Sequence, residues 1–428
     1  MASVVLGERQ WFDAWFQAEK KFSLIRYDEI VLDSQAFDVY AQDELDTVDK
    51  EGRGGDAREY SAVKRTRSAV HLLSLIDGVT ETYKLIPSLA QRLRFLAEIQ
   101  LSLLSQYHQR ISSAIDSFEA LSLIRSVSVP GALPDAVTGV MIASESGGII
   151  PALRRLCRWW ASARTIREDI RYWAEDDFFL SMQHEVNTHL SVIDEAGVRA
   201  ILRPGSADAE EISLFSTVLI DFDALSERIE KLIISIIAKE WMTNARTYAK
   251  RDTWWQTSAE TLNEISSDLY RPLQDLRIAC NFLYSTLPLP DYTSVYRRIS
   301  QEIEDWYWGH VITQNQFSKQ GSSQLETDLQ LGFWKTGRQW IRKPENYTKR
   351  LKETLKLLVL TFNTTTTDHD NSETQTSLTY DTFMKALVDT SQKSMIQEEL
   401  DRLGIEVLNY NQIRDVLRRR SDTLCSWN

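Results

Sequence analysis

Residues 151–190 contain no Gly or Pro after the first residue, Pro151. Pro suits the first turn of a helix because its missing N–H has no partner there, and Gly147 and Gly148 end the preceding segment. Seven apolar residues recur at the three- and four-residue steps of an amphipathic helix: Leu153, Leu156, Trp160, Ala163, Ile166, Ile170 and Trp173. A single helix of this length reaches about 60 Å. The segment therefore predicts a rod or an extended helical bundle.

The same helical period recurs along the chain. No long stretch alternates apolar and polar residues in the way that a β-strand does. Only 16 Gly and 9 Pro in 428 residues also favour an all-α fold. In the first predicted helix, the apolar side that needs a partner helix carries Trp11, Trp15, Phe22 and Ile25. Helices are expected at 11–40, 61–86, 88–125, 210–250, 254–287, 291–317, 322–341, 344–363, 378–388, 394–403 and 412–419.

Breaks in this pattern suggest two helical regions. The run Arg203 to Ser206 contains Pro and Gly, so we expect a first bundle region at 1–205 and a C-terminal one at 206–428. Residues 43–59 are acidic and nearly free of apolar side chains, which predicts a flexible loop. Further loops are expected at 126–148 and 363–377.

Charge and cysteine content exclude several classes of protein. A net charge of -12 argues against general binding to nucleic acid or anionic lipid. The three Cys are scattered without metal-site spacing, which favours a reducing, cytosolic compartment. The most apolar run, 232–238, is far shorter than the roughly 20 residues of a membrane-spanning helix. The N-terminus lacks the long apolar core of a signal peptide. Because a helix follows Met1, Ala2 and Ser3 at once, we expect the natural protein to extend further toward the N-terminus.

A search for catalytic and metal-binding motifs finds none. His184 and His189 are five residues apart, about 140° around a helix, so they cannot hold one metal ion. Phosphate-binding loops, dinucleotide motifs and nucleophile elbows are absent from the sequence. Its carboxylate pairs are of the kind that any solvated helix carries. We therefore predict no catalytic, cofactor-binding or metal-binding residues, and no enzyme.

Two clusters have residue types that bind partners. The aromatic cluster consists of Trp306, Trp308, Trp334 and Trp340, and Trp is enriched both in cores and at interface hot spots. Helical spacing favours the core interpretation, and partner binding is the alternative. Arg418, Arg419 and Arg420 form a basic end, which is more typical of a solvated helix terminus than of a phosphate site.

Several stretches match a family pattern in the same order along nearly the whole chain. They are WFDAWFQAEKKFSL at 11–24, RLRFLAEIQLSLLSQYHQRI at 92–111, YWAEDDFFLSMQ at 172–183, and FSKQGSSQLETDL at 317–329 followed by RKPENYTKRLKE at 342–353. Together they resemble the RINT/TIP subunit of the Dsl/NRZ tethering complex. That family reads FN-x-GG-x-x-Q-L-x-x-D and then RPENYFK or near it, so the run from Ser318 to Gly321 departs from its Gly-Gly turn.

The resemblance implies an elongated rod of stacked helical bundles, of the exocyst and conserved-oligomeric-Golgi (CATCHR) type. It implies a non-enzymatic subunit of an endoplasmic reticulum (ER) tethering complex that captures Golgi-derived COPI vesicles in retrograde transport. The C-terminal part of the rod would bind the N-terminal domain of an ER Qb SNARE. Attachment to the cytoplasmic face of the ER membrane would be indirect, through the SNARE and through other tether subunits bound by an N-terminal segment absent here.

Two alternatives stay open at this point. One is a helical scaffold used in another context, such as checkpoint or centrosome function, and a more remote one is a helical enzyme. Pull-down with ER SNAREs separates the first from the tether, and a deep pocket with perturbed pKa values would indicate the second. In either case, Trp173, Phe178, Phe179 and Leu180 are expected to lock neighbouring helices together.

Overall fold

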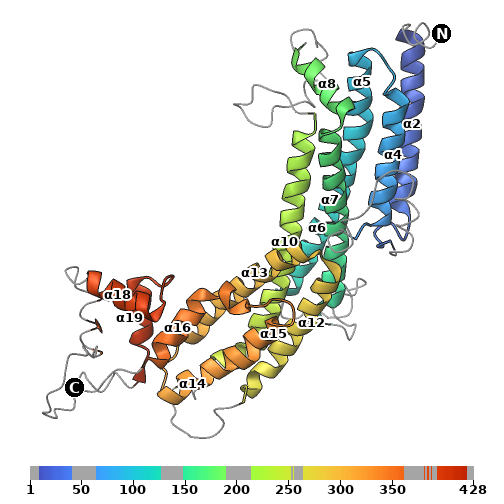
Figure 1. The fold of residues 1–428 in the computed structure, drawn as a ribbon. Coiled ribbons are helices and arrows are strands. Elements are labelled where there is room, and N and C mark those ends of the chain that lie inside the picture. Colours follow the sequence, from blue (N-terminus) through green and yellow to red (C-terminus); the bar gives the residue numbers. More distant parts are fainter. Residues whose placement is uncertain are drawn as a thin grey trace, which may run out of the picture. The chain divides into compact units, whose positions relative to one another are not determined.

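The computed structural model describes residues 9–40, 64–126, 148–188, 214–251, 254, 264–360, 380, 383–384, 387 and 393–421. These residues form helices and two isolated β-bridges, with no strand among them (Figure 1). The all-α prediction is therefore confirmed. The predicted loops at 43–59, 126–148 and 363–377 lie outside the described residues, apart from the edge residues Ser126 and Gly148.

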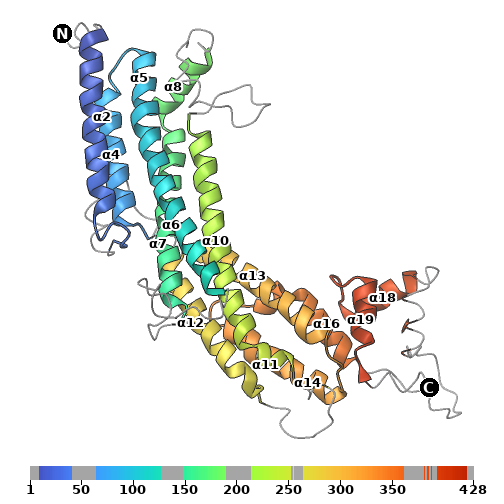
Figure 2. The same ribbon diagram turned by 180° about the vertical axis from the view of Figure 1, so that it is seen from behind.

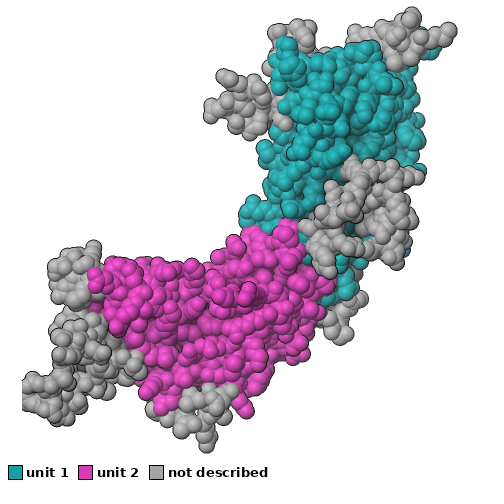
Figure 3. Space-filling model, in the orientation of Figure 1, with its two compact units in different colours: residues 1–233, 286–288 teal, residues 234–285, 289–428 magenta. Residues whose placement is uncertain are grey.

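The chain divides into two compact units, residues 1–233 with 286–288 and residues 234–285 with 289–428 (Figure 3). The boundary predicted at 205 lies outside the described residues. The observed division falls inside helix α10 (Ser216–Asn244), because one continuous helix can contribute its two ends to different cores. Each unit is described separately below.

Unit 1 consists of long helices around one apolar core (Figure 1). The predicted helix at 88–125 is observed as one continuous run with a π-helical segment, η2, inside it. The helices are α2 (Arg9–Leu32), α4 (Arg67–Tyr83), α5 (Leu89–Phe95), η2 (Leu96–Leu101), α6 (Ser102–Ser126), α7 (Ile150–Ala174), α8 (Asp177–Thr188) and the start of α10.

The prediction of one uninterrupted helix over 151–190 is wrong, because α7 ends at Ala174 and α8 begins at Asp177. The side chain of Asp176 explains the break: its Oδ1 accepts a hydrogen bond from the backbone N–H of Phe178 at 2.9 Å. A carboxylate that caps a new first turn competes with continuation of the old helix. The predicted apolar stripe of α7 is confirmed, since all seven of its residues are buried.

Helix α2 packs with a different face from the one predicted. Phe12, Phe16 and Tyr27 are buried, whereas Trp11 and Phe22 are 61% and 62% exposed. The buried face contacts α4 and η2. Both faces of α2 are apolar at helical spacing, so periodicity predicts the helix correctly but does not choose between them.

Helix α10 lies beside α6 and α7 in unit 1 (Figure 2). Trp160 Nε1 on α7 donates a hydrogen bond to Glu230 Oε1 on α10 at 3.1 Å. Arg228 of α10 pairs with Asp116 and Glu119 on α6. These contacts join three helices that are well separated along the chain.

Unit 2 is built from shorter helices, two of which pass into π-helical segments. Helix α13 continues as η5, and α14 continues as η6. Besides the end of α10, the elements are α11 (Arg246–Ala249), η4 (Ser267–Leu269), α12 (Tyr270–Thr286), α13 (Leu289–Trp306), η5 (Tyr307–Ile312), α14 (Lys319–Thr327), η6 (Asp328–Trp334), α15 (Lys335–Gly337), η7 (Pro344–Tyr347), α16 (Lys349–Val359), α18 (Lys393–Leu403) and α19 (Tyr410–Leu417).

The turn that departs from the family pattern is well formed. Ser318 is the N-cap of α14, and its Oγ accepts a hydrogen bond from the backbone N–H of Gly321 at 3.0 Å. The N–H of Ser318 in turn donates to the carbonyl oxygen of Trp254 at 2.9 Å. A Ser cap therefore begins this helix.

None of the helices described here is both long enough and apolar enough to cross a bilayer.

Candidate partner-binding site

The four tryptophans proposed for partner binding occupy two kinds of position in unit 2. Trp306 and Trp334 are core residues, 3% and 4% exposed. Trp308 and Trp340 are half-buried and keep part of each ring at the surface. The structure thus divides a cluster that the sequence presents as a single group.

Trp306 and Trp334 hold the core of unit 2 together. The Trp306 ring meets the Trp241 ring edge to face, with centroids 6.1 Å apart. Trp334 Nε1 donates a hydrogen bond to Thr348 Oγ1 at 2.9 Å, which satisfies its buried polar atom. Both residues belong mainly to the core, and only a small part of each ring reaches the surface.

Trp308 and Trp340 remain as surface candidates. The guanidinium of Arg350 lies over the Trp308 ring, 5.1 Å from its centroid, and also pairs with Asp305. The Trp340 ring packs against the Tyr292 ring at a centroid distance of 6.4 Å. Each ring is therefore held in place on one side while part of it stays accessible, and such rings lose little entropy on binding a partner.

A groove of about 660 Å³ opens near η5 and is lined on one side by the edge of Trp306. Arg246 and Lys250 line this groove, called the cationic groove below, and none of its described lining residues is a carboxylate. The His310 ring stacks on Trp306, and its Nδ1 lies 3.2 Å from the Trp306 carbonyl oxygen. The groove therefore suits acidic groups of a partner on a chain that is acidic as a whole.

A second groove of about 630 Å³ lies between η6 and α16. Its lining mixes charges: Glu326 and Glu345 face Lys352, Lys356 and Arg338. Lys356 donates to the backbone oxygens of Leu403 and Gly404. This groove therefore offers both signs of charge, with one more basic than acidic side chain.

A buried carboxylate, Asp328, fixes the start of η6. Its two oxygens accept hydrogen bonds from Tyr248 Oη, from Ser266 N–H and Oγ, and from Gln324 Nε2, at 2.7–3.0 Å. Burial raises the pKa of Asp328, although these donors act in the opposite direction. Because both oxygens are occupied by donors of the protein itself, the arrangement indicates a structural role.

Sequence reasoning missed the π-helical segments η5 and η6 of unit 2. π-Bulges occur often at functional sites. Trp308 lies in η5, and Trp334 lies in η6. No motif in the sequence reports an i to i+5 hydrogen bond, so no available signal would have found them. Among the described residues, no group of His, Cys, Asp and Glu could hold a metal ion, and His184 is an exposed residue of α8.

Comparisons with known proteins give one consistent result. Residues 1–420 match the family model of the RINT-1/TIP-1 family. RINT1-like protein MAG2 of Arabidopsis thaliana is 22% identical over 364 residues, which cover 83% of this chain and 39% of that protein. The crystal structure of the SNARE Sec20 bound to the Dsl1 complex subunit Tip20 is similar in fold, with a TM-score of 0.58 at 13% identity. That match covers 96% of this chain and 59% of the solved chain, so the chain spans less than two thirds of either relative.

Proposed function

The chain belongs to the RINT-1/TIP-1 family, and from this premise we propose that it is a non-enzymatic part of an ER tether that binds an ER Qb SNARE. The observation that carries the proposal is the family match over residues 1–420. The fold agrees with it, because the similar solved structure is that of a Dsl1 complex subunit bound to the SNARE Sec20. The SNARE's N-terminal helical domain is the proposed contact.

The proposed contact elements on unit 2 are the Trp308 ring, the Trp340 ring and the cationic groove. Two partly exposed indoles supply apolar anchors, and Trp is enriched among the residues that dominate binding energy. Arg246 and Lys250 supply positive charge that steers an acidic partner surface. A helical domain can then lie along the helices of unit 2 by the same ridge and groove packing that joins helices within it.

The proposed cellular role is to hold Golgi-derived COPI vesicles near the ER during retrograde transport. The chain would lie at the cytoplasmic face of the ER as a peripheral protein, attached through the SNARE and through other tether subunits. In such a role the protein supplies a helical surface for its partners. The buried hydrogen bonds of Asp328 stabilise the fold of unit 2.

The experiment is a pull-down of this chain with the cytosolic parts of ER SNAREs at low and moderate salt. Binding of a Qb SNARE that depends on its N-terminal domain supports the proposal. If the chain binds none of the SNAREs while a longer protein of the same family does, the placement of the SNARE site on this part is wrong.

A further inference from the structure

Helix α2 carries a second apolar stripe on the face that does not pack into unit 1. Seven positions follow one another at alternating four- and three-residue steps, and all but Glu29 are apolar: Trp11, Trp15, Ala18, Phe22, Ile25, Glu29 and Leu32. Trp15 is half-buried, and the exposed fractions of the four other large apolar side chains are 61% for Trp11, 62% for Phe22, 51% for Ile25 and 72% for Leu32.

The packing of unit 1 accounts for only part of this stripe. The Trp15 ring contacts the Phe95 ring of α5, with centroids 5.1 Å apart, whereas the other large apolar side chains stay exposed. Figure 1 and Figure 2 show α2 at the edge of the unit, beside α4. The face that contacts α4 and η2 carries Phe12, Phe16 and Tyr27, all buried. Contiguous exposed apolar surface is uncommon on a monomer and marks an interaction site. The step of 3.5 residues is that of a coiled-coil seam, so the fitting partner is another helix.

We propose that this stripe pairs with the same stripe of a second copy of the chain, as an antiparallel coiled coil. The charged residues that flank the stripe argue for antiparallel pairing. In a parallel pair, Lys21 would lie beside Arg26 of the second copy and Asp28 beside its Asp33, so like charges would meet. In an antiparallel pair, Lys21 lies beside Asp28 and opposite charges meet.

The apolar residues select a register within the antiparallel arrangement. When Phe22 of one copy faces Ile25 of the other, Trp15 faces Leu32. In the same register Glu29 faces the small side chain of Ala18, which leaves room for a carboxylate. The two-fold symmetry repeats each of these contacts, as in an isologous dimer.

The remaining flanking charges agree with this register. Glu19 of one copy lies beside Arg26 of the other. Within one copy, Arg26 pairs with Glu29 at 2.7 Å, and this ion pair compensates the negative charge of Glu29 within the stripe. A single helix pair is small compared with the roughly 1,600 Å² of a standard interface, and we expect a dissociation constant in the micromolar range.

The test is sedimentation velocity on the whole chain from about 1 to about 200 µM. The proposal predicts that the average mass rises with concentration from 49.4 kDa toward twice that value. Phe22→Glu abolishes the rise. Leu85→Glu is the matched control, because Leu85 is 91% exposed and lies off the stripe, and it leaves the rise unchanged. A chain that stays monomeric throughout, or equal effects of the two variants, overturns the proposal.

A charge exchange tests the antiparallel arrangement and does not depend on core substitutions. Lys21→Asp alone and Asp28→Lys alone each weaken self-association by about tenfold or more, because like charges then meet. An equimolar mixture of the two variants restores it, since opposite charges meet in the mixed dimer. If the mixture associates no better than either variant alone, the proposed pairing is wrong.

Discussion

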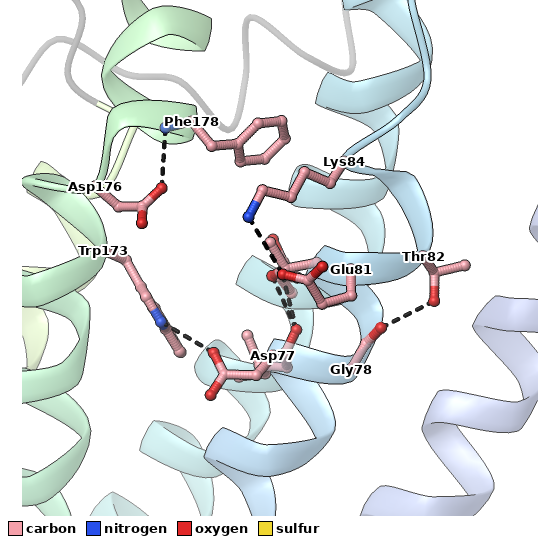
Figure 4. A network of polar contacts seen from close by, with 11 residues as sticks. Asp77, Gly78, Glu81, Thr82, Lys84, Trp173, Asp176 and Phe178 are labelled. Carbon is pink, nitrogen blue, oxygen red and sulfur yellow. Dashed lines mark hydrogen bonds and ion pairs between the residues drawn. The ribbon is translucent and has the colours of Figure 1, made fainter. Parts of the chain in front are cut away.

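Trp173 Nε1 donates a hydrogen bond to Asp77 Oδ1 at 3.1 Å and so joins α7 to α4 in unit 1 (Figure 4). The Trp173 side chain is 5% exposed, and its ring packs near that of Phe215 with centroids 6.3 Å apart. The residue stands two positions before the break between α7 and α8. Its contacts therefore stabilise the end of α7 where the helix stops.

Replacing Trp173 by Ala is expected to lower the free energy of unfolding by about 3–5 kcal/mol, through the cavity it leaves. Trp173→Phe retains most of the packing and loses the hydrogen bond, at a cost nearer 1 kcal/mol. Urea unfolding at equilibrium measures both. SNARE binding is expected to change only through stability, and a stably folded Trp173→Ala protein that lost its SNARE partner would refute the structural assignment.

Asp328 is expected to make the stability of unit 2 depend on pH. Because burial raises its pKa in the folded state, the folded protein holds this proton more tightly than the unfolded chain does. The contribution of Asp328 to the free energy of unfolding is therefore fully present below the pKa that this carboxyl has in the unfolded chain. It is lost as pH rises through the pKa of the folded state. Asp328→Asn removes the titration, so the stability of wild type relative to this variant should fall as pH rises from about 4 to about 8.

The sign of that slope is the decisive observation, and chemical denaturation at several pH values provides it. A wild-type advantage that grows with pH would contradict the assignment. Asp328→Ala is expected to be worse than Asp328→Asn at every pH, because Tyr248 Oη and the Ser266 N–H then lose their acceptor. The additional cost is about 1–3 kcal/mol for each buried donor left unpaired.

Glu353 is expected to hold α19 on α16. Its carboxylate, on a residue 5% exposed, accepts the backbone N–H groups of Glu406, Val407 and Leu408 at 3.0–3.1 Å. Glu353→Gln replaces one acceptor oxygen by an amide donor, and we expect a loss of about 1–3 kcal/mol. Hydrogen exchange should accelerate at residues 405–417.

A nearby exposed ion pair provides the control. Lys349 lies 3.9 Å from Glu406, and both side chains are more than half exposed. Lys349→Ala should change stability by less than about 0.5 kcal/mol and leave exchange at 405–417 unaltered. Equal protection loss in the two variants would show that Glu353 has no special role.

Gly321 is expected to tolerate no side chain. A Cβ at this position would overlap the carbonyl oxygen of Trp254 and lie 2.9 Å from its carbonyl carbon. Because the obstacle is backbone, Gly321→Ala should cost about 1–3 kcal/mol. Gly309→Ala is the matched control: it has nothing within 4 Å and should be neutral or stabilising by up to about 1 kcal/mol. Thermal unfolding of both variants decides the comparison.

The fold class and most helices could be predicted because apolar spacing at three and four residues is a local property. The sequence was a weaker guide to which face of a helix is buried and to where a long helix breaks. Both faces of α2 carry apolar residues, and only the neighbours decide that Phe16 is buried and Phe22 exposed. The break after α7 depends on the Asp176 cap, which is one of several carboxylates in its segment.

The candidate site was predictable as a region but not residue by residue. Trp306, Trp308 and Trp334 have the same chemistry in the sequence. Trp306 ends α13, and Trp308 follows two residues later in η5, about 200° around the helix, so the two rings point to different sides. A π-turn adds a residue to the helix, so the three-four rhythm no longer reports which face points inward. The sequence therefore could not show which of these rings faces the core.

The central claim is tested most directly by titrating this chain with the N-terminal helical domain of an ER Qb SNARE by calorimetry. The account predicts saturable binding that weakens about tenfold or more in Trp308→Ala and Trp340→Ala. Tyr270→Ala, which removes an aromatic side chain 54% exposed on the same unit, should bind as wild type does. Absence of binding at low and moderate salt, while a longer family member binds the same domain, would contradict the account.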